Sequence, residues 1–503
     1  MNTKKLAVMN ASSGLLSQFA LIGLQFVQRK LFLDFLGVEL IGISGTITSI
    51  VAAASLAEGG VQSAIIYNLY APLQDRDTEK INKLLNVYRY LFQLVGTAII
   101  GFSVLVSPLL PRILTGVEVN GTVYLYFFLS AASSSASYFL SYKRALISAD
   151  RSEYITRMVD LFCNLGFYVV RIAIIVFLKS YAAFLISGIL MTVTTNTIVH
   201  FICKKRYPFL KAEKHDKACL REMLPQMREL FGGAVAAYVF RSSDNIVISK
   251  MVNTVSVGLL ASYTLVTRNL KDVILSIFTS AGPMLGNIIT ASSEKDDKRR
   301  DAFNLYSMGI YVLAAVLTVP EFVLLDFFVE NVWGAAYLLP RATVVLLVLD
   351  QYLTLVQDPC GVYIIADGQF RQCKHADTAA AVINIVTSVL LAWKYQIAGV
   401  LMGTIISRSV QWIMKFYYLN LSLNGNWQSY LLYWVKNIYK FAVFCACIVI
   451  VEMIFNIIPI DTFIVKFVLV GICGVAVTLV MLCACFWFTN DRKLIQHYLI
   501  KRR

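Results

Sequence analysis

Long apolar runs separated by short polar segments dominate this chain. A helix needs about 20 predominantly apolar residues to cross a bilayer, and runs of that kind predict fourteen membrane spans along the sequence. The second run is too long for a simple span and contains Glu58-Gly59-Gly60, so we expect it to bend or end there. The predicted spans cover residues 11–33, 41–70, 91–107, 122–142, 158–178, 182–202, 230–249, 257–279, 304–327, 342–360, 377–393, 398–420, 437–457 and 464–488.

Positively charged residues lie mainly between alternate spans. With the N-terminus inside, the inner segments hold 30 Lys and Arg, and the outer segments hold only five. Because cytoplasmic loops are enriched in Lys and Arg, this pattern predicts that both termini are cytoplasmic. The formal net charge of +15 is therefore mostly a topology signal, and we expect no nucleic-acid partner. A composition that is 58% hydrophobic and 15% charged excludes an ordinary water-soluble protein.

A weak internal repeat relates the two halves of the chain. At an offset of 216 residues Gly42 falls on Gly258, and Thr48 falls on Thr264. We therefore predict an all-α polytopic membrane protein with about 14 transmembrane helices. The helices form two pseudo-symmetric six-helix lobes, at 1–215 and 216–423, followed by two additional transmembrane helices and a basic cytoplasmic tail at 424–503. Transporters built from such repeats place their substrate between the halves, near the midplane of the membrane.

Ten of the 45 Lys and Arg residues lie inside the predicted spans. Even the lower estimates put the cost of an arginine at the centre of a membrane helix at about 2.5–3.5 kcal/mol. Arg29 and Arg171 have no carboxylate three or four positions away on their own helix, so a pairing along the helix does not explain them. A water-filled cavity that accepts an anion would explain such residues, and the candidates for binding an anionic head group are Arg29, Arg171, Arg241 and Arg268.

A structural explanation stays open for part of this set, because Arg241 can pair with Asp244, and Arg268 with Asp272, along one helix. Polar residues at helical spacing also suggest cavity lining and ion coupling. The candidates for cavity lining are Gln25, Asn164, Lys271 and Arg408. The candidates for ion coupling are Asp160, Asp244, Asp272 and Asp350.

Enzymatic motifs are not evident in the sequence. Asp75-Arg76-Asp77 has the DxD form found in some glycosyltransferases, but it stands alone in a short loop. The chain has no phosphate-binding glycine loop with its lysine, so we expect no ATP-driven step. The four histidines and ten cysteines show no metal-ligand spacing. We therefore predict a secondary transporter with no catalytic residues, metal or cofactor.

Several stretches resemble the bacterial polysaccharide flippases of the Wzx type, in the multidrug/oligosaccharidyl-lipid/polysaccharide exporter superfamily. The resemblance is carried by residues 35–81, by SYKRALISADRSEYI at 141–155, by residues 244–266 and by IAGVLMGTIISR at 397–408. It runs over most of the chain in the same order. At the eighth predicted span the chain departs from the family pattern, which has mostly uncharged polar residues where Arg268, Lys271 and Asp272 stand here.

The resemblance implies a two-lobed flippase with a cationic central cavity that works by alternating access. Such proteins move undecaprenyl-pyrophosphate-linked oligosaccharide repeat units from the cytoplasmic to the outer leaflet of the bacterial plasma membrane. A lipid-linked oligosaccharide is then the substrate. The polymerase and glycosyltransferases of the same surface-polysaccharide pathway are the expected partners.

Two other functions remain as alternatives. An ion-coupled multidrug exporter of the same superfamily would favour an acidic or aromatic cavity, and the arginines within the spans argue against it. A membrane polysaccharide polymerase or ligase is the third hypothesis. Such enzymes usually carry a sizeable outer domain, whereas the outer loops predicted here are short.

Overall fold

The computed structural model describes residues 21–279, 296–460 and 462–487, and within these ranges every regular element is a helix. The chain divides into two compact units, Met1–Ala261 and Ser262–Arg503. The first described element of the first unit is the helix Leu21–Leu36. It continues with α2 (Val38–Ala54), η1 (Ser55–Glu58), α3 (Val61–Asp75), α4 (Thr78–Val106), η2 (Ser107–Leu109), α5 (Leu110–Ile113), α6 (Gly121–Ser141), α7 (Arg144–Ala149), α8 (Glu153–Ala173), η3 (Ile174–Leu178), α9 (Tyr181–Arg206), α10 (Lys217–Tyr238), η4 (Val239–Ser243) and α11 (Asp244–Met251).

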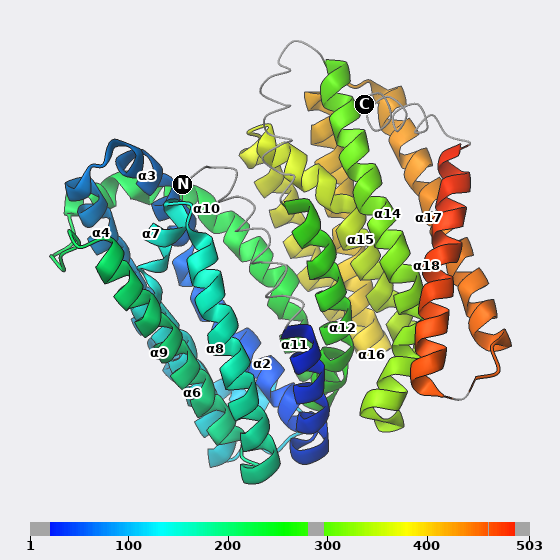
Figure 1. The fold of residues 1–503 in the computed structure, drawn as a ribbon, viewed down its shortest axis with the longest axis horizontal. Helices are drawn as coiled ribbons and strands as arrows, with labels where there is room; N and C mark the ends of the chain where they lie inside the picture. Colours follow the sequence, from blue (N-terminus) through cyan, green and yellow to red (C-terminus); the bar gives the residue numbers. More distant parts are fainter. Residues whose placement is uncertain (1–20, 280–295, 461, 488–503) are drawn as a thin grey trace. The chain divides into compact units, whose positions relative to one another are not determined.

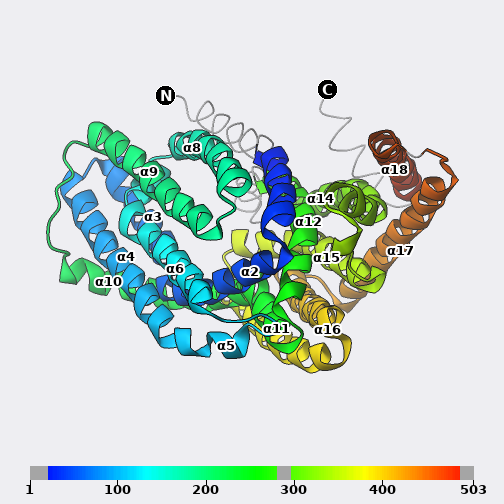
Figure 2. The same cartoon turned by 90° about the horizontal axis from the view of Figure 1, so that it is seen from below.

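The helix α12 (Thr254–Thr279) begins in the first unit and continues into the second. In the second unit α14 packs against α15, α17 and α18, which are drawn in Figures 1 and 2. The elements after α12 are α14 (Asp296–Phe328), η5 (Val329–Trp333), η6 (Ala335–Tyr337), α15 (Arg341–Ala366), α16 (Phe370–Ser422), α17 (Trp427–Ile457) and α18 (Phe463–Trp487).

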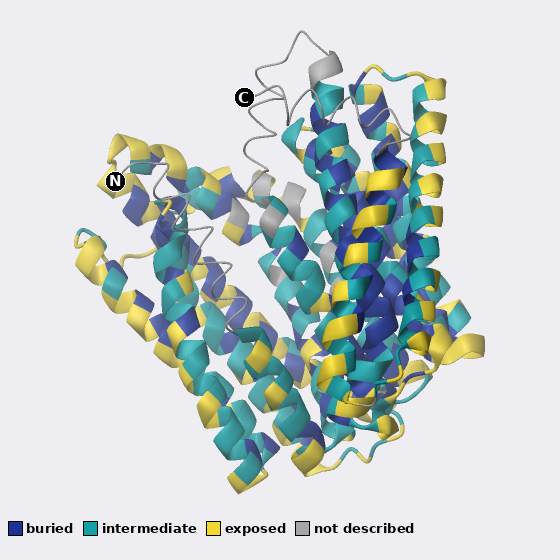
Figure 3. Cartoon of the chain, turned by 45° about the vertical axis from the view of Figure 1, so that its right-hand side comes forward, coloured by how far each residue is buried: buried dark blue, intermediate teal, exposed yellow. Residues whose placement is uncertain are grey.

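The surfaces of these helices carry many large apolar side chains. Within the described ranges, seven helices are long and apolar enough to cross a membrane, or eight if the bent pair Leu21–Leu36 and Val38–Ala54 is one span. Phe177, Trp393 and Ile457 are among the large apolar side chains that are largely exposed. Figure 3 shows the alternation of buried and exposed positions along the helices. Extensive exposed apolar surface needs a nonpolar surrounding, and the prediction of an all-α polytopic membrane protein is confirmed.

The predicted spans coincide with helices wherever the structure describes them, and the predicted bend in the second run is present. The short helix η1 ends at Glu58, and Gly59 and Gly60 follow with φ of 45° and 86°. This left-handed backbone favours glycine and ends one helix before α3 begins. In α16, Gln396 has non-helical φ and ψ, which separates the two spans predicted at 377–393 and 398–420.

Helices near the middle of the chain pack against helices near its start. Within the first unit α10 contacts α3 and α4, and α11 contacts α2 and α5. The lobe boundaries expected at residues 215 and 423 remain predictions.

The first unit also joins the two glycines that the internal repeat relates. Gly42 of α2 and Gly258 of α12 lie at a close crossing of the two helices. A Cβ atom at Gly42 would overlap the carbonyl oxygen of Thr254, and one at Gly258 would overlap the carbonyl oxygen of Val38. Only glycine lets the two backbones approach this closely.

Candidate functional site

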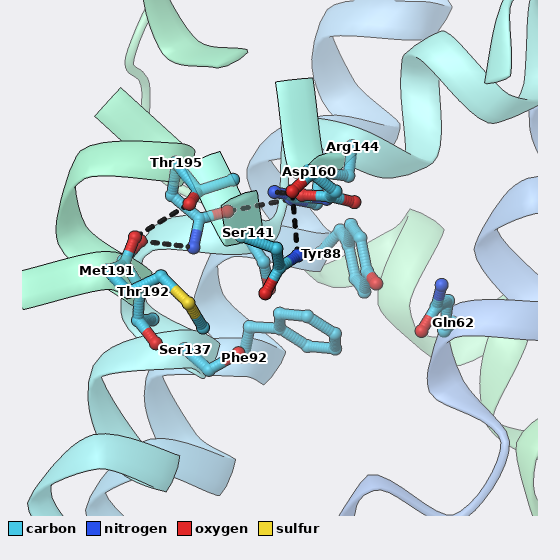
Figure 4. Close-up of a pocket in the computed structure, with 12 residues that line it drawn as sticks. Gln62, Tyr88, Phe92, Ser137, Ser141, Arg144, Asp160, Met191, Thr192 and Thr195 are labelled. Carbon is cyan, nitrogen blue, oxygen red and sulfur yellow. Dashed lines mark hydrogen bonds and ion pairs between the residues drawn. The ribbon is translucent and has the colours of Figure 1, made fainter. Parts of the chain in front are cut away.

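The first unit contains a polar cavity of about 340 Å³, which Figure 4 shows in close-up. Helices α3, α4, α6, α7, α8 and α9 surround it. Hydroxyl and amide groups from α6, α8 and α9 line the cavity beside two aromatic rings of α4. The lining residues are Gln62, Tyr88, Phe92, Ser137, Ser141, Arg144, Asp160, Asn164, Met191, Thr192, Thr195 and Asn196.

Arg144 is the organising side chain of this cavity. Its Nη1 and Nη2 donate to the two carboxylate oxygens of Asp160 at 2.9 and 2.8 Å, and its Nε donates to Oδ1 of Asn196 at 2.8 Å. A bidentate arginine–carboxylate pair is stronger and more directional than a single neutral hydrogen bond. One side chain at the start of α7 thereby connects α8 to α9 across the cavity (Figure 4).

The local fold explains how Arg144 reaches this position. A turn follows α6 at Tyr142 and Lys143, and the six-residue helix α7 begins at Arg144. Asp160 and Asn164 lie four residues apart on α8, and Nδ2 of Asn164 donates to the carbonyl oxygen of Asp160 at 2.7 Å. Both residues are therefore on the helix face that meets the cavity.

Two residues selected from the sequence lie at this cavity, and one important residue was missed. Asp160, a candidate for ion coupling, and Asn164, a candidate for lining, both contribute to the wall. Asp160 is already neutralised by Arg144. Arg144 lies in an inner segment between two predicted spans, where a basic residue is typical of a topology signal.

Arg171 occupies a different environment on α8. Its guanidinium carbon lies 5.1 Å from the ring centroid of Phe184, and its Nη2 lies beside Gly188, both on α9. Its Nε is buried without a hydrogen-bond partner, and no carboxylate of the described residues lies within ion-pair distance. A cation held over an aromatic face keeps its full charge, so Arg171 can still bind an anion.

The helix Leu21–Leu36 lies against α8 and α9 near Arg171. Gln25 and Tyr168 are joined by a side-chain hydrogen bond, and Phe32 makes an edge-to-face contact with Phe184. Arg29 and Arg171 each lie about one helical turn beyond this hydrogen-bonded pair along their own helices. Arg29 likewise forms no ion pair with any residue in the described ranges.

Arg241 belongs to the π-helical turn η4, and Asp244 begins α11 directly after that turn. The side chain of Arg241 lies outside the described part of the structure. The pairing of Arg241 with Asp244 therefore remains a prediction.

In the second unit, the predicted charged residues form a group of both signs. Nε of Arg408 donates to Oδ1 of Asp350 at 2.5 Å, and the two side chains are only 11% and 20% exposed. Lys271 interacts electrostatically with both Asp350 and Arg408. Arg268 is 71% exposed and 3.7 Å from Asp272, so this predicted pair is a loose surface contact.

A second buried ion pair joins the two halves of α16, which are separated at Gln396. Nζ of Lys415 lies 2.7 Å from Oδ1 of Asp377, and Nε2 of Gln411 donates to the same oxygen at 2.8 Å. The charge of Lys415 is therefore compensated.

Removing one partner of the Arg408–Asp350 pair is expected to destabilise the second unit. Breaking a buried pair costs about 3–5 kcal/mol, because one charge stays buried without its partner. Arg408→Met should therefore lower the thermal unfolding temperature of the purified protein. The double variant Arg408→Met/Asp350→Leu should recover much of the loss. A double variant no more stable than Arg408→Met would show that the pair does not carry this energy.

Several solved structures of other proteins match the fold of this chain. The lipid II flippase MurJ in an inward closed conformation matches with a TM-score of 0.68 at 15% identity, over 95% of this chain and 99% of that chain. A MATE transporter from Vibrio cholerae matches with a TM-score of 0.61 at 14% identity, over 83% and 98%. The chain has the fold of the MOP-superfamily transporters. A further match is a MOP-superfamily transporter from Pyrococcus furiosus, described by the reverse polarity of its binding pocket, with a TM-score of 0.53 at 15% identity, over 84% and 96%.

No protein-family model and no curated protein sequence matches this chain. At these identities the MOP-superfamily matches establish the fold.

Proposed function

We propose that this protein is a flippase for an anionic, lipid-linked oligosaccharide. It accepts an undecaprenyl-pyrophosphate-linked repeat unit from the cytoplasmic leaflet and delivers it to the outer leaflet, where the unit enters a surface polysaccharide. The two halves of the protein open alternately to the two sides of the membrane. The polyprenyl chain stays in the bilayer while the sugar crosses through the polar interior.

The observation that carries this proposal is the presence of arginines without carboxylate partners on membrane helices. Arg29 and Arg171 make no ion pair with any described residue, whereas Arg144 and Arg408 are each compensated by an aspartate. An uncompensated arginine within a membrane is expensive, and such residues usually mark a substrate or ion pathway. A pyrophosphate supplies several acceptor oxygens that match the donor fork of a guanidinium.

The same observation disfavours the multidrug exporter with the same fold. A site for organic cations would favour uncompensated carboxylates, and the cavity carboxylate in the first unit, Asp160, is held by Arg144. The MurJ match, which covers almost the full length of both chains, supports the shared fold. Arg241 and Arg268 are proposed as further contacts to the anionic head group, with Gln25, Lys271 and Arg408 in the lining.

We place the protein in the bacterial plasma membrane with both termini in the cytoplasm. The glycosyltransferases of the pathway supply its substrate, and a polymerase uses its product. An ion gradient or the membrane potential drives the transport. One elementary charge crossing 100 mV releases about 2.3 kcal/mol.

Deletion of the gene should cause lipid-linked oligosaccharide to accumulate on the inner leaflet and surface polysaccharide to disappear. Labelling of lipid-linked sugars in the native host measures both effects. Arg171→Ala should fail to restore export at a normal membrane level, because the anion loses its cation. Arg29→Ala is expected to behave in the same way.

Arg157→Ala provides the matched control on the same helix. Arg157 forms an exposed pair with Glu153, four residues away, and such pairs contribute at most about 1 kcal/mol. This variant should export normally. An unchanged polysaccharide and no accumulated lipid-linked sugar in the deletion strain would refute the flippase function. Full activity of both Arg29→Ala and Arg171→Ala would refute only the proposed anion site.

A further inference from the structure

A carboxyl group is buried in the second unit without any cation beside it. Glu321 of α14 is 7% exposed, and Gln351 of α15 is 4% exposed. Nε2 of Gln351 donates to Oε2 of Glu321 at 2.8 Å. An ionised carboxylate with one neutral donor and no cation is costly in such surroundings, whereas the neutral acid is far less so.

The remaining polar atoms of this pair indicate which form is present. Oε1 of Glu321 and Oε1 of Gln351 are both buried, and neither has a hydrogen-bond donor among the described residues. Two acceptor oxygens cannot bond to each other, so both stay unsatisfied while Glu321 is ionised. A proton on Oε1 of Glu321 would supply a donor that the ionised pair lacks.

Charged groups on the neighbouring helices are engaged elsewhere and do not compensate Glu321. Helices α15, α17 and α18 pack against α14, and α12 contacts it through Ile274 and Phe278. On α12, Arg268 lies near Asp272, and Lys271 interacts with Asp350. On α15, Asp350 pairs with Arg408, and Arg341 pairs with Asp326 and Glu452. Of the lysines on the other two helices, Lys440 of α17 lies over Tyr311, and Lys466 of α18 lies over Phe327 and Phe455. Burial and the bond from Gln351 are the influences that act on the carboxyl of Glu321.

We propose that Glu321 and Gln351 form a proton-binding site of the second unit. Neutral Glu321 donates its Oε1–H to Oε1 of Gln351, and Nε2–H of Gln351 donates to Oε2 of Glu321. The two side chains then form a cyclic acid–amide pair with every polar atom satisfied. Proton release requires a conformation in which water or a cation reaches the carboxylate.

Glu321 lies at a point where α14 can bend. Pro320 precedes it, lacks an N–H, and so leaves the carbonyl oxygen of Val316 without its helical hydrogen bond. Helices kink most readily at proline. Bending at this point would move Glu321 relative to Gln351 on α15. The proton site does not depend on the proposed substrate, but its use to drive transport rests on the proposed flippase function.

Infrared spectroscopy of the purified full-length protein tests the protonation directly. A neutral carboxylic acid has a C=O stretching band that a carboxylate lacks. At pH 7 the wild type should show this band, and Glu321→Gln should lose it. Gln351→Met should keep the acid but shift the band, because its hydrogen-bond partners are gone. Glu452→Gln is the control, since Glu452 is 46% exposed and paired with Arg341, and it should leave the band unchanged.

Stability and export separate the remaining outcomes. Glu321→Gln should keep the thermal unfolding temperature of the wild type, because glutamine replaces the neutral acid in the pair, and it should lose export. No acid band assignable to Glu321 would overturn the proposal and show instead an ionised carboxylate, for instance one with a bound water between the two oxygens. A band lost in Glu321→Gln with full export would limit the site to a structural role. The infrared result stands whether or not the substrate is a lipid-linked sugar, so it can fail independently of the proposed function.

Discussion

Arg144→Ala is expected to abolish export and to destabilise the first unit. The substitution removes all three hydrogen bonds that the guanidinium donates to Asp160 and Asn196, and it leaves Asp160 as an uncompensated negative charge in the cavity. Loss of one partner costs about 3–5 kcal/mol for a fully buried pair. The side chains of Arg144 and Asp160 are 24% and 40% exposed, so solvent should reduce this cost to about 1–3 kcal/mol.

Two further variants distinguish a structural role of Arg144 from a role in transport. Arg144→Lys keeps the charge but cannot form the bidentate pair and reach Asn196 at the same time, so it should retain partial stability and partial export. The double variant Arg144→Ala/Asp160→Ala removes both charges. It should recover most of the stability yet remain inactive if the cavity needs the pair for transport.

The measurements are the thermal unfolding temperature of the purified protein and the surface polysaccharide of the complemented deletion strain. Arg157→Ala, which removes an exposed cation from α8, should leave both unchanged. Normal export by Arg144→Ala would exclude the cavity from the transport path. Export restored by the double variant would assign the pair a purely structural role.

Periodicity and charge in the sequence are sufficient to predict the helices of this protein but only part of its polar interior. The apolar runs mark the spans because a bilayer requires them, and the glycine pair after Glu58 marks a bend because its backbone is left-handed. Asp160 and Asn164 could be selected because residues four apart share one face of a helix. Within a single helix, spacing determines the neighbours.

Contacts between different helices could not be predicted from the spacing of residues in the sequence. Arg144 reaches Asp160 only because α7 folds back after α6, and a count of basic residues per segment assigns it to topology. Phe184 and Gly188 contact Arg171 from another helix, at no regular spacing in sequence. Glu321 has no charged partner along its helix, and its contact with Gln351 on α15 has no regular spacing in the sequence.

The internal repeat is the case in which a weak sequence signal acquires a physical meaning. Gly42 and Gly258 were aligned by offset alone, and the structure places them in one helix crossing. Each contacts the backbone of the other helix. Glycine is needed at both positions for one shared reason, the close approach of α2 and α12.

Gly42→Ala is expected to destabilise the protein, whereas Gly101→Ala is expected to stabilise it. The new Cβ would overlap the carbonyl oxygen of Thr254, and because that oxygen belongs to a backbone, α2 and α12 would have to separate. Forcing extra volume into a packed contact costs about 1–3 kcal/mol or more. Gly258→Ala should have a similar effect, because its Cβ would overlap the carbonyl oxygen of Val38 on α2.

Gly101→Ala in α4 is the matched control, since no heavy atom lies within 4 Å of a Cβ built there. Replacing a helical glycine by alanine without a clash should stabilise a helix by about 0.5–1 kcal/mol. The two substitutions should therefore shift the thermal unfolding temperature in opposite directions, although both introduce the same methyl group. Equal shifts would mean that α2 and α12 do not meet as closely as described. Opposite shifts would show that the cost arises from the crossing, because helix propensity alone favours alanine at both positions.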